Sequence, residues 1–373
     1  MQGALAGVRI ADFSRILAGP YATMLLADLG AEVIKVERPP LGDDTRQWGP
    51  PYDETGGATY FQSINRNKRS VAIDLSTDDG RAAARTLIES SDVVIENFVP
   101  GTMEKFGLGY DALRAKQPGL VYASITGFGR SDVAASMPGY DLLVQAVGGL
   151  MSITGPDPSR PTKVGVALVD VITGLHCAIG VLAALRHRDA TGEGQRVDVS
   201  LLGSTLSALV NQAGAYVGAG VTPTAMGNAH PSIAPYETFD TADRPLALAV
   251  GNDGQFRNCV HVLGLAELAD DPRFSTNPER VRYRAELRPL LQNVLLQRGA
   301  DHWSDVFARV NVPCGPVNTM DEAFALATRL GLDPIRIADG VRTVANPIGL
   351  SRTPARYELR PPDVGNTELD EVL

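Results

Sequence analysis

The sequence predicts an α/β protein whose main domain is a doubly wound, Rossmann-like parallel sheet. Short apolar segments of strand length recur through the first half of the chain, and segments with helical periodicity lie between them. This alternation is the pattern of a parallel sheet with helices on both faces. The chain has 373 residues, which is enough for such a domain and for a smaller second one.

Five strands are expected in the first half of the chain: Val8–Phe13, Glu32–Glu37, Ser70–Leu75, Asp92–Ile95 and Leu120–Ile125. A helix between the first two strands begins at Gly19-Pro20 and ends at Gly30, because proline suits a first helical turn and glycine suits a helix end. A second helix covers Asp78–Ser90, where acids in the first turn interact favourably with the helix dipole.

The middle of the chain is predicted to be mainly helical, with helices at Tyr140–Met151, Ala167–Arg188 and Ser204–Tyr216. Between the second and third of these helices, Arg196–Leu202 is predicted to be a strand or an extended segment. The segment Gly218–Pro235 is rich in glycine, proline and threonine and predicts a linker, and a short strand at Leu246–Val250 then precedes further helices. We therefore expect a large domain in residues 1–221 and a smaller one in residues 222–329. Residues 330–373 are expected to complete the large domain, because the two ends of a chain often lie together.

Charge and cysteine content narrow the class of protein. The formal net charge is −9 and there is no basic run, which argues against nucleic acid or an anionic membrane as the main partner. The three cysteines are scattered and the five histidines form no ligand pattern, so neither a disulfide framework nor a metal site is expected. These features, with an N-terminus that does not resemble a signal peptide, predict a cytoplasmic protein.

Asp170 is the only acid in the apolar stretch 164–185. A charge buried in such a stretch costs several kcal/mol unless it is paired or used in chemistry. The stretch is long enough to consider as a membrane span. The presence of Asp170, His176 and three glycines favours a buried helix instead.

Two interpretations of Asp170 follow from its position near a helix start. As a structural acid it would interact favourably with the helix dipole. As a catalytic group it would be kept ionised by the same helix end and would act as a nucleophile at neutral pH. Gly165 and Gly174 would let a substrate or a second backbone approach closely. Two other acids are weaker candidates, because Asp141 is expected to be a helix cap and Glu237 a solvent-facing strand residue that could otherwise assist acid–base chemistry.

Polar and basic residues flank several of the predicted strands. Ser14–Pro20 follows the first strand, Lys35–Arg38 ends the second and Asn65–Arg69 precedes the third. Ligands of parallel sheets bind at the carboxyl ends of the strands, so three such clusters suggest one shared anionic ligand. The alternative is an ordinary turn or a solvated strand end with a local ion pair. After the fourth strand, Asn97 could bind a base edge and Phe98 could stack on a ring.

Taken together, the segments resemble the class III CoA-transferases, the formyl-CoA and carnitine CoA-transferase type. The resemblance covers nearly the whole chain and is carried by VRIADFSRILAGPYATMLLADLGAEVIKVERP, NRNKRSVAIDL, DVVIENFVPGTMEKFGLGYDAL, YASITGFGRS, PGYDLLVQAVGGLMSITG, KVGVALVDVITGLHCAIGVLAAL and HPSIAPYETF. It implies a Rossmann-like large domain built from both chain ends, with a smaller domain between them. It also implies an interlocked homodimer of two ring-like chains threaded through each other.

The resemblance further implies a set of site residues. Asp170 matches the family's catalytic aspartate, and coenzyme A is bound as a substrate, so no resident cofactor is expected. The positions that match the family's CoA-binding residues are Leu17, Ala18, Arg38, Ile73, Asp74, Leu75, Ser76, Asn97, Phe98, Val99, Lys105, Thr126, Gly127, Phe128 and Gly129.

The mechanism that the resemblance implies is covalent. The Asp170 carboxylate attacks an acyl-CoA thioester to give a mixed anhydride, and the released thiolate then gives an enzyme–CoA thioester. An acceptor carboxylate finally leaves as its CoA ester, and succinyl-CoA is the expected donor. Backbone N–H groups near Gly251–Gly254 could stabilise the oxyanions, although that segment is otherwise a tight turn or a flap.

Three departures from the family pattern bear on the substrate. Leu17 stands where formyl-CoA transferases have glutamine, which argues against oxalate or formate chemistry. Lys105 replaces an arginine and keeps the charge without the planar fork. Tyr140 stands where the related α-methylacyl-CoA racemases have a catalytic histidine, which disfavours the alternative of α-methylacyl-CoA epimerisation. The remaining alternative is a CoA-binding protein without turnover, in which Asp170 would be a helix cap.

Overall fold

The structure, a computed structural model, describes residues 3–373, which form two compact units. Unit 1 contains the described residues up to Leu150 together with Val164–Val221 and Asp333–Leu373. Unit 2 contains Met151–Lys163 and Thr222–Leu332. Each unit has its own hydrophobic core, so each is described separately below.

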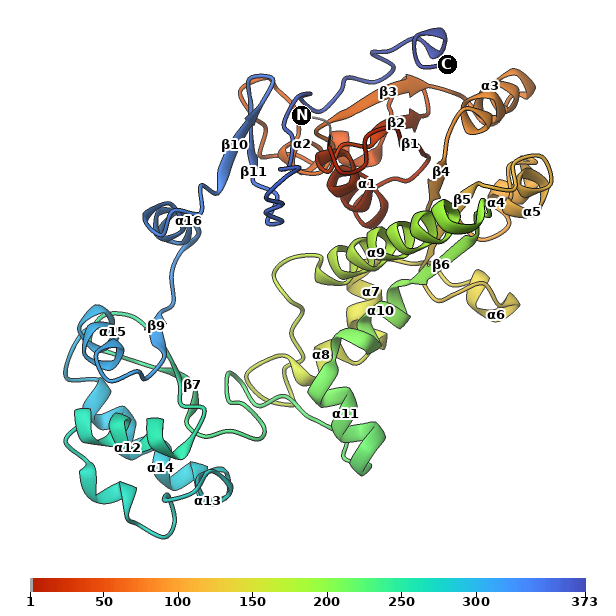
Figure 1. Ribbon diagram of the computed structural model, residues 1–373. Coiled ribbons are helices and arrows are strands. Elements are labelled where there is room, and N and C mark those ends of the chain that lie inside the picture. Colours follow the sequence, from red (N-terminus) through yellow and green to blue (C-terminus); the bar gives the residue numbers. More distant parts are fainter. Residues whose placement is uncertain (1–2) are drawn as a thin grey trace. The chain divides into compact units, whose positions relative to one another are not determined.

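The centre of unit 1 is a six-stranded sheet in the order β3-β2-β1-β4-β5-β6, in which all neighbours are parallel (Figure 1). The strands are β1 (Arg9–Asp12), β2 (Glu32–Glu37), β3 (Lys68–Ala72), β4 (Val93–Glu96), β5 (Val121–Thr126) and β6 (Arg196–Ser200). The strand order reverses between β1 and β4, and ligands of doubly wound sheets bind beside such a reversal. The predicted α/β class with a parallel sheet is confirmed.

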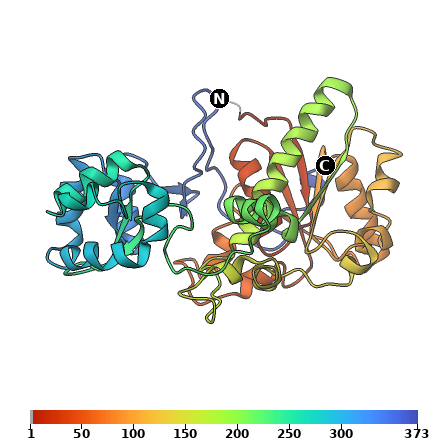
Figure 2. The same ribbon diagram turned by 90° about the horizontal axis from the view of Figure 1, so that it is seen from below.

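Helices cover both faces of this sheet (Figures 1 and 2). One face carries α1 (Ala18–Asp28) and α9 (Leu168–Thr191), and the other carries α3 (Asp78–Glu89), α4 (Thr102–Lys105) and α5 (Tyr110–Arg114). Strand side chains alternate between the two cores: Val93 and Ile95 pack with α1 and α9, whereas Val94 packs with α3. The continuous apolar strands in the sequence are therefore buried on both sides.

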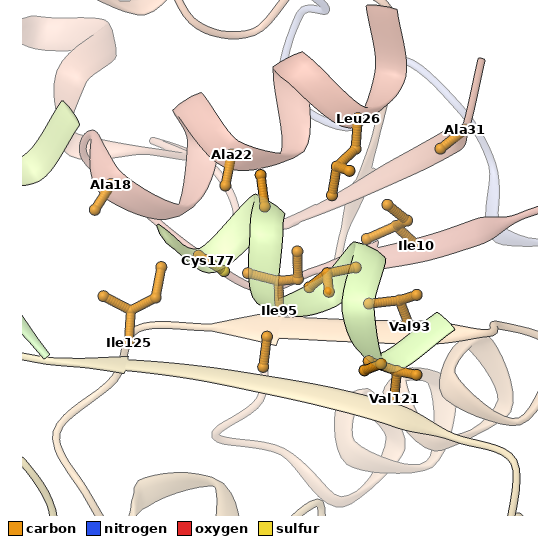
Figure 3. Close-up of a cluster of buried hydrophobic side chains, with 14 of the residues drawn as sticks. Ile10, Ala18, Ala22, Leu26, Ala31, Val93, Ile95, Val121, Ile125 and Cys177 are labelled. Atoms are coloured by element: carbon orange, nitrogen blue, oxygen red, sulfur yellow. The ribbon is translucent and has the colours of Figure 1, made fainter. Parts of the chain in front are cut away.

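The apolar helix α9 belongs to the first of these cores. Figure 3 shows Cys177 of α9 between α1, which carries Ala22, and the strand residue Ile95. Its length and composition would suit a membrane span, but its buried face makes it a core helix of the α/β fold. Close packing depends on Gly174, because a Cβ there would lie 2.6 Å from the carbonyl oxygen of Ala18.

Some predicted boundaries in the middle of the chain differ from the structure. Two shorter helices, α7 (Asp141–Val147) and α8 (Leu150–Ile153), replace the single helix expected from Tyr140 to Met151. Between them Gly149 has a φ of +86°, which lies outside the right-handed helical region and ends α7.

The helix expected at Ser204–Tyr216 is also divided, into α10 (Leu201–Ala208) and α11 (Val210–Ala219), and β3 starts two residues before its expected start. Short elements that the sequence did not predict include η1 (Asp44–Gln47), α2 (Thr59–Gln62), α4, α5, α6 (Asp132–Ala135) and η3 (Leu369–Glu371).

The C-terminal segment packs on the sheet of unit 1. It begins with an antiparallel hairpin of β10 (Ile335–Ala338) and β11 (Val341–Val344). Further along, the N–H of Thr367 donates to the carbonyl oxygen of Ser70 at 3.1 Å, and Val372 is buried in the core beside α3. The last residues therefore take part in the core that β3 and α3 build.

Unit 2 contains an antiparallel sheet in the order β7-β8-β9 and a layer of helices. Its elements are β7 (Tyr236–Phe239), β8 (Leu246–Ala249), α12 (Asp253–Val262), η2 (Ala266–Ala269), α13 (Asn277–Arg282), α14 (Arg284–Leu295), α15 (Ala300–Ala308), β9 (Cys314–Pro316) and α16 (Met320–Arg329). Phe256, Leu291 and Phe307 lie at the centre of its core.

Two segments that the sequence marks as candidates for the site, Gly251–Gly254 and Glu237, lie in unit 2. The segment Gly251–Gly254 forms the start of α12, where the side chain of Asn252 accepts the N–H of Gln255 at 2.9 Å. The carboxylate of Glu237 is nearly buried and pairs with Arg288 at 2.7 Å. In this structure Glu237 therefore acts as an ion-pair partner on β7 rather than as a solvent-facing strand residue.

Candidate active site

Two clefts open beside the carboxyl ends of the strands in unit 1. Cleft 1 has a volume of about 260 Å³ and is lined by the loops after β1, β4 and β5, by residues 137–140 and by Asp170. Cleft 2 has a volume of about 250 Å³ and is lined by the end of β2 and by the loops after β3 and β4. Both clefts lie beside the reversal of strand order, where a doubly wound sheet is expected to bind its ligand.

The structure brings most of the predicted site residues to these clefts. Cleft 1 is lined by Leu17, Ala18, Asn97, Phe98, Val99, Thr126, Gly127 and Asp170. Cleft 2 is lined by Arg38, Ile73, Asp74, Leu75, Ser76 and Phe98. Three predicted residues line neither cleft. Lys105 is exposed at the end of α4, Phe128 packs against the hydrophobic core, and Gly129 donates its N–H to Thr126 Oγ1 at 3.0 Å.

Asp170 lies in the first turn of α9, and another carboxylate caps this helix. Oδ2 of Asp141 accepts the backbone N–H of Val169 at 2.9 Å and that of Asp170 at 3.2 Å. Asp141 is thus a helix cap, as expected, but it caps α9 rather than α7, on which it lies. Its other oxygen accepts from Gln145 Nε2 at 2.6 Å, and Gln145 Oε1 accepts the N–H of Val164 at 2.9 Å.

The ionisation of Asp170 differs from the sequence expectation. Burial, and after it the negative charge of Asp141, raise the pKa of Asp170 from its ordinary 3.8 to about 7. The expectation that the helix end would favour the ionised form is wrong, because burial and the charge of Asp141 favour the neutral form, and Asp141 itself accepts the N–H groups of Val169 and Asp170. A carboxylate with a raised pKa in a cleft is typical of groups that take part in covalent or acid–base chemistry.

Tyr60 on α2 is a neighbour of this carboxylate that no motif in the sequence marks. Burial raises the pKa of Tyr60 to about 12, and the charges of Asp170 and Asp141 add to the effect. The phenol is therefore a neutral hydrogen-bond donor near the two acids at any physiological pH. Its ring packs edge-on against Trp48, with the ring centroids 5.3 Å apart.

Asn97 joins the loops on the two sides of the strand-order reversal. Its Oδ1 accepts the N–H of Arg15 at 2.9 Å, and its Nδ2 donates to the carbonyl oxygen of Arg15 at 2.7 Å. The side-chain amide is therefore engaged by a neighbouring peptide, so the expectation that Asn97 binds a base edge is not supported by its geometry. It thereby holds Arg15, which lines both clefts, from the side of cleft 1.

A buried ion pair fixes the residues on either side of Arg15. Lys35 Nζ donates to the carbonyl oxygen of Ser14 and to Asp43, each at 2.9 Å. A carboxylate oxygen of Asp43 in turn accepts the N–H of Ile16 at 3.2 Å. Burial alone would raise the pKa of Asp43, but the charge of Lys35 and bonds from Lys35 and Thr45 lower it to about 2.

The same bonds hold a strained residue in the loop. Ile16 has a φ of +70°, a left-handed conformation that is uncommon for a β-branched residue. Such strain persists only where the surroundings enforce it, and it is concentrated at functional sites. The loop between β1 and α1 is thus held in one shape where it lines cleft 1.

Three basic residues that the sequence assigned to an anionic ligand, Lys35, Arg66 and Lys68, serve the fold instead. Lys35 is fully buried against Asp43, and Lys68 is fully buried with its Nζ 3.3 Å from Asp12. Arg66 makes a two-pronged contact with Asp28 at 2.9 and 2.6 Å. The cluster Asn65–Arg69 lines neither cleft, and buried carboxylates pair with its Arg66 and Lys68.

Arg38, which directly follows β2, remains a basic residue that a ligand can reach. The local ion pair considered for Glu37 is made by Arg46, through Nη2–Oε1 at 2.6 Å and Nε–Oε2 at 2.8 Å. Arg38 is exposed and lines cleft 2. Hydrogen bonds from Ser76, and the charge of Arg38, lower the pKa of Asp74 on the same cleft.

The far wall of cleft 1 depends on two glycines. A Cβ on Gly127 would lie 2.5 Å from the Cα of Gly139, so the loop after β5 and residues 137–140 pack backbone against backbone. Met137 and Tyr140 thereby reach the cleft that holds Asp170. The sequence named Tyr140 only for comparison with racemases, and it gave no signal for Met137.

The arrangement suits a long ligand with one reactive end and one anionic end. Cleft 1 offers a carboxylate with a raised pKa in a partly apolar setting, and cleft 2 offers an exposed arginine beside hydrogen-bonding groups. Arg15 and Phe98 line both clefts. A carboxylate placed in this way can form a covalent ester-like bond with an acyl group.

Comparisons with known proteins agree with this geometry. Residues 5–368 match CoA-transferase family III. The chain is 44% identical over 374 residues to the succinate–glutarate CoA-transferase of Agrobacterium fabrum, covering 97% of this chain and 93% of that protein. It is 42% identical to the human succinyl-CoA:glutarate CoA-transferase, covering 86% of this chain and 73% of that protein.

A solved structure extends the similarity to the fold. The crystal structure of a CaiB/BaiF family protein from Brucella suis superposes with a TM-score of 0.88 at 43% sequence identity, covering 98% of this chain and 97% of that chain. The family match over residues 5–368 includes the helix that carries Asp170 and both sets of cleft loops. The chain belongs to CoA-transferase family III, and it is a CoA-transferase.

Proposed function

We propose that this enzyme moves CoA from succinyl-CoA to a second dicarboxylic acid through covalent intermediates on Asp170. The observation that carries the proposal is the position of the Asp170 carboxylate, which lines cleft 1 with a pKa raised to about 7. The curated relatives described above, which are named for succinate and glutarate, support the choice of substrates.

The steps conserve the energy of the thioester. A carboxylate oxygen of Asp170 attacks the donor thioester carbon, the C–S bond breaks, and a mixed anhydride and CoA thiolate form. The thiolate attacks the aspartyl carbonyl carbon, which releases the donor acid and leaves an aspartyl–CoA thioester. The acceptor carboxylate then attacks the carbonyl carbon of this thioester, its C–S bond breaks, and a second anhydride and CoA thiolate form. Attack of the thiolate on its acceptor carbonyl carbon releases the new acyl-CoA and restores the Asp170 carboxylate.

Unit 1 supplies the proposed CoA-binding surface. In this proposal the nucleotide lies in cleft 2 with Arg38 and Ile73–Ser76, and the thioester lies in cleft 1 beside Asp170. The acyl chain would lie against Leu17 and Met137, whose side chains suit methylene groups better than the polar, two-carbon oxalyl group.

Covalent trapping tests the proposal. The enzyme is incubated with succinyl-CoA and then with hydroxylamine or borohydride, and the peptide containing Asp170 is analysed by mass spectrometry. We expect modification of Asp170 in the wild type and none in Asp170→Asn, with transfer to glutarate lost in the variant. Transfer at an undiminished rate in Asp170→Asn would overturn the proposal. Appearance of solvent deuterium at C2 of an acyl-CoA without transfer would indicate epimerisation instead.

We also propose that the enzyme is a homodimer. Large apolar side chains are exposed on two helices of unit 1, including Ile179 on α9, which is 63% exposed, and Val217 on α11, which is 83% exposed. Large exposed apolar surfaces are typical of a protein–protein interface. Sedimentation velocity tests this, because a monomer at micromolar concentration would contradict it.

The cysteines support a cytoplasmic location. Cys177, Cys259 and Cys314 are all free thiols, and the first two are buried. Unpaired cysteines are typical of proteins that work in a reducing compartment. Fractionation of cells that express the chain, with an antibody to it, would contradict this location if the protein were found outside the cytoplasm.

A further inference from the structure

Arg15 occupies the junction of the two clefts. It lines cleft 1 together with Asp170 and lines cleft 2 together with Arg38. Phe98 is the other residue that lines both clefts, and the Arg15 guanidinium lies 5.5 Å from the centre of its ring. Any ligand that extends from one cleft to the other must therefore pass these two side chains.

The backbone at Arg15 is held from several directions. Asn97 bonds both the N–H and the carbonyl oxygen of Arg15, Lys35 bonds the carbonyl oxygen of Ser14, and Asp43 bonds the N–H of Ile16. Four hydrogen bonds from side chains thus fix the two peptide groups on either side of Arg15. A backbone held in this way presents its side chain to a ligand without a further loss of conformational entropy.

The guanidinium itself has only a weak partner. Arg15 Nη1 lies 3.5 Å from Asp44, and the two side chains are 47% and 49% exposed. An exposed ion pair at this distance contributes little and gives way readily to a ligand. Lys35, by contrast, is fully buried and bound to Asp43, so it offers no charge to cleft 2. Among the described residues that line the clefts, Arg15 and Arg38 are the accessible cations.

We infer that Arg15 binds the diphosphate of coenzyme A at the junction of clefts 1 and 2, an inference that rests on the proposed function. If the thioester lies at Asp170 and the nucleotide lies beside Arg38, the part of CoA between them passes Arg15. The diphosphate is the anionic group of that part. The planar fork of arginine matches two phosphate oxygens, and Phe98 holds the fork from one side.

Ligands that lack defined parts of CoA test the assignment. Affinities of the full-length wild type and of Arg15→Ala are measured by calorimetry for CoA and for dephospho-CoA, which lacks only the 3′-phosphate. The kcat/KM for transfer is measured with succinyl-CoA and with succinyl-pantetheine, which lacks all phosphates. We expect Arg15→Ala to weaken both CoA and dephospho-CoA by about 10-fold or more and to leave succinyl-pantetheine unaffected.

Each other outcome overturns the assignment in a recognisable way. Unchanged CoA affinity removes Arg15 from the site. A loss seen with CoA but not with dephospho-CoA assigns Arg15 to the 3′-phosphate, and an equal loss with succinyl-pantetheine assigns it to the acid. A wild type that binds no CoA would contradict the proposed function itself and not only the role of Arg15.

Control variants separate binding from folding. Arg114→Ala removes an exposed arginine on α5 that lines neither cleft, and it should bind CoA like the wild type. Arg15→Lys keeps the charge and loses the fork, so its affinity should lie between those of the wild type and Arg15→Ala. If Arg15→Ala does not fold, Arg15→Gln and Arg15→Lys are compared in its place, and equal CoA affinity in both and in the wild type would overturn the assignment.

Discussion

Oδ2 of Asp141 accepts the backbone N–H of Asp170 at 3.2 Å, so two carboxylates share the start of α9. The repulsion between the two carboxylates favours acylation in the proposed reaction, because Asp170 loses its negative charge when it is acylated. The neighbouring charge that raises the pKa of Asp170 therefore also favours the anhydride and the thioester over the free carboxylate. Asp141 is a positioning residue for the helix start and an electrostatic neighbour of the nucleophile.

Replacing Asp141 by Asn should separate these two roles. The amide oxygen of Asp141→Asn can still accept the N–H groups of Val169 and Asp170, but the repulsive charge is gone. We expect the pKa of Asp170 to fall, so the acid limb of the kcat/KM profile should move to lower pH and less aspartyl–CoA thioester should be trapped. Asp111→Asn changes an acid in the first turn of α5 and serves as the control. An acid limb that stays in place would contradict this role for Asp141.

The raised pKa of Asp170 also predicts a pH-dependent stability. Its folded pKa of about 7 lies above the ordinary 3.8, so the folded state binds more protons than the unfolded state between these values. The contribution of Asp170 to stability is therefore complete below pH 3.8 and is lost as the pH rises through about 7. Asp170→Asn should become progressively more stable than the wild type over this window. Melting temperatures measured across it check the prediction, and a constant difference would refute it.

Arg38 should contribute directly to the binding of CoA. It is the exposed base at the end of β2, and Glu37 is already paired with Arg46. We expect Arg38→Ala to weaken CoA binding by about 10-fold or more, since a charge-assisted hydrogen bond to phosphate is lost. Calorimetric titration with CoA measures the change, with Arg114→Ala as the control. Equal affinities of Arg38→Ala and the wild type would remove Arg38 from the site.

The buried pair of Lys35 and Asp43 should matter far more for stability than a surface pair. Asp43→Asn leaves the buried ammonium of Lys35 without its closest counter-charge and should cost about 3 kcal/mol or more in free energy of unfolding. Asp363→Asn breaks the exposed pair with Arg360 and should cost less than about 1 kcal/mol. Urea unfolding of both variants compares them, and equal costs would contradict the argument.

The stabilising contribution of the Lys35–Asp43 ion pair should persist at mildly acidic pH. The pKa of Asp43 is lowered to about 2, below its ordinary 3.8, so its stabilising contribution is present above pH 3.8 and is lost only as the pH falls through about 2. The stability difference between the wild type and Asp43→Asn should therefore be constant at mildly acidic pH and shrink below that range. A difference that already shrinks near neutral pH would show that another group governs it.

Local patterns were sufficient for the sheet and its covering helices. The strand Glu32–Glu37 has the predicted bounds because its apolar residues continue through a segment that is buried on both faces. The helix Asp78–Glu89 was recognisable from its first-turn acids, and Thr77 caps it by accepting the N–H of Gly80. These signals lie within a few residues of the element that they define.

Partners that are distant in the sequence explain what the residues alone did not predict. Asp28 neutralises Arg66 from 38 positions away, which turned an apparent anion-binding cluster into a structural one. Asp141 caps a helix that starts more than 20 residues later, so its effect on the pKa of Asp170 had no local signature. Arg15 was visible in a polar loop, but only the fold shows that it lies between two clefts.

The clamp made by Asn97 limits how the pocket can change shape. Because one amide ties the β1–α1 loop to the loop after β4, these two segments must shift as a single piece. Substitutions in the opposite wall of cleft 1 are therefore better suited to accommodating larger acceptor acids. Met137 and Tyr140 in that wall are exposed and are not bonded by Asn97. Directed evolution toward bulkier products should accumulate its useful substitutions there and leave Asn97 untouched.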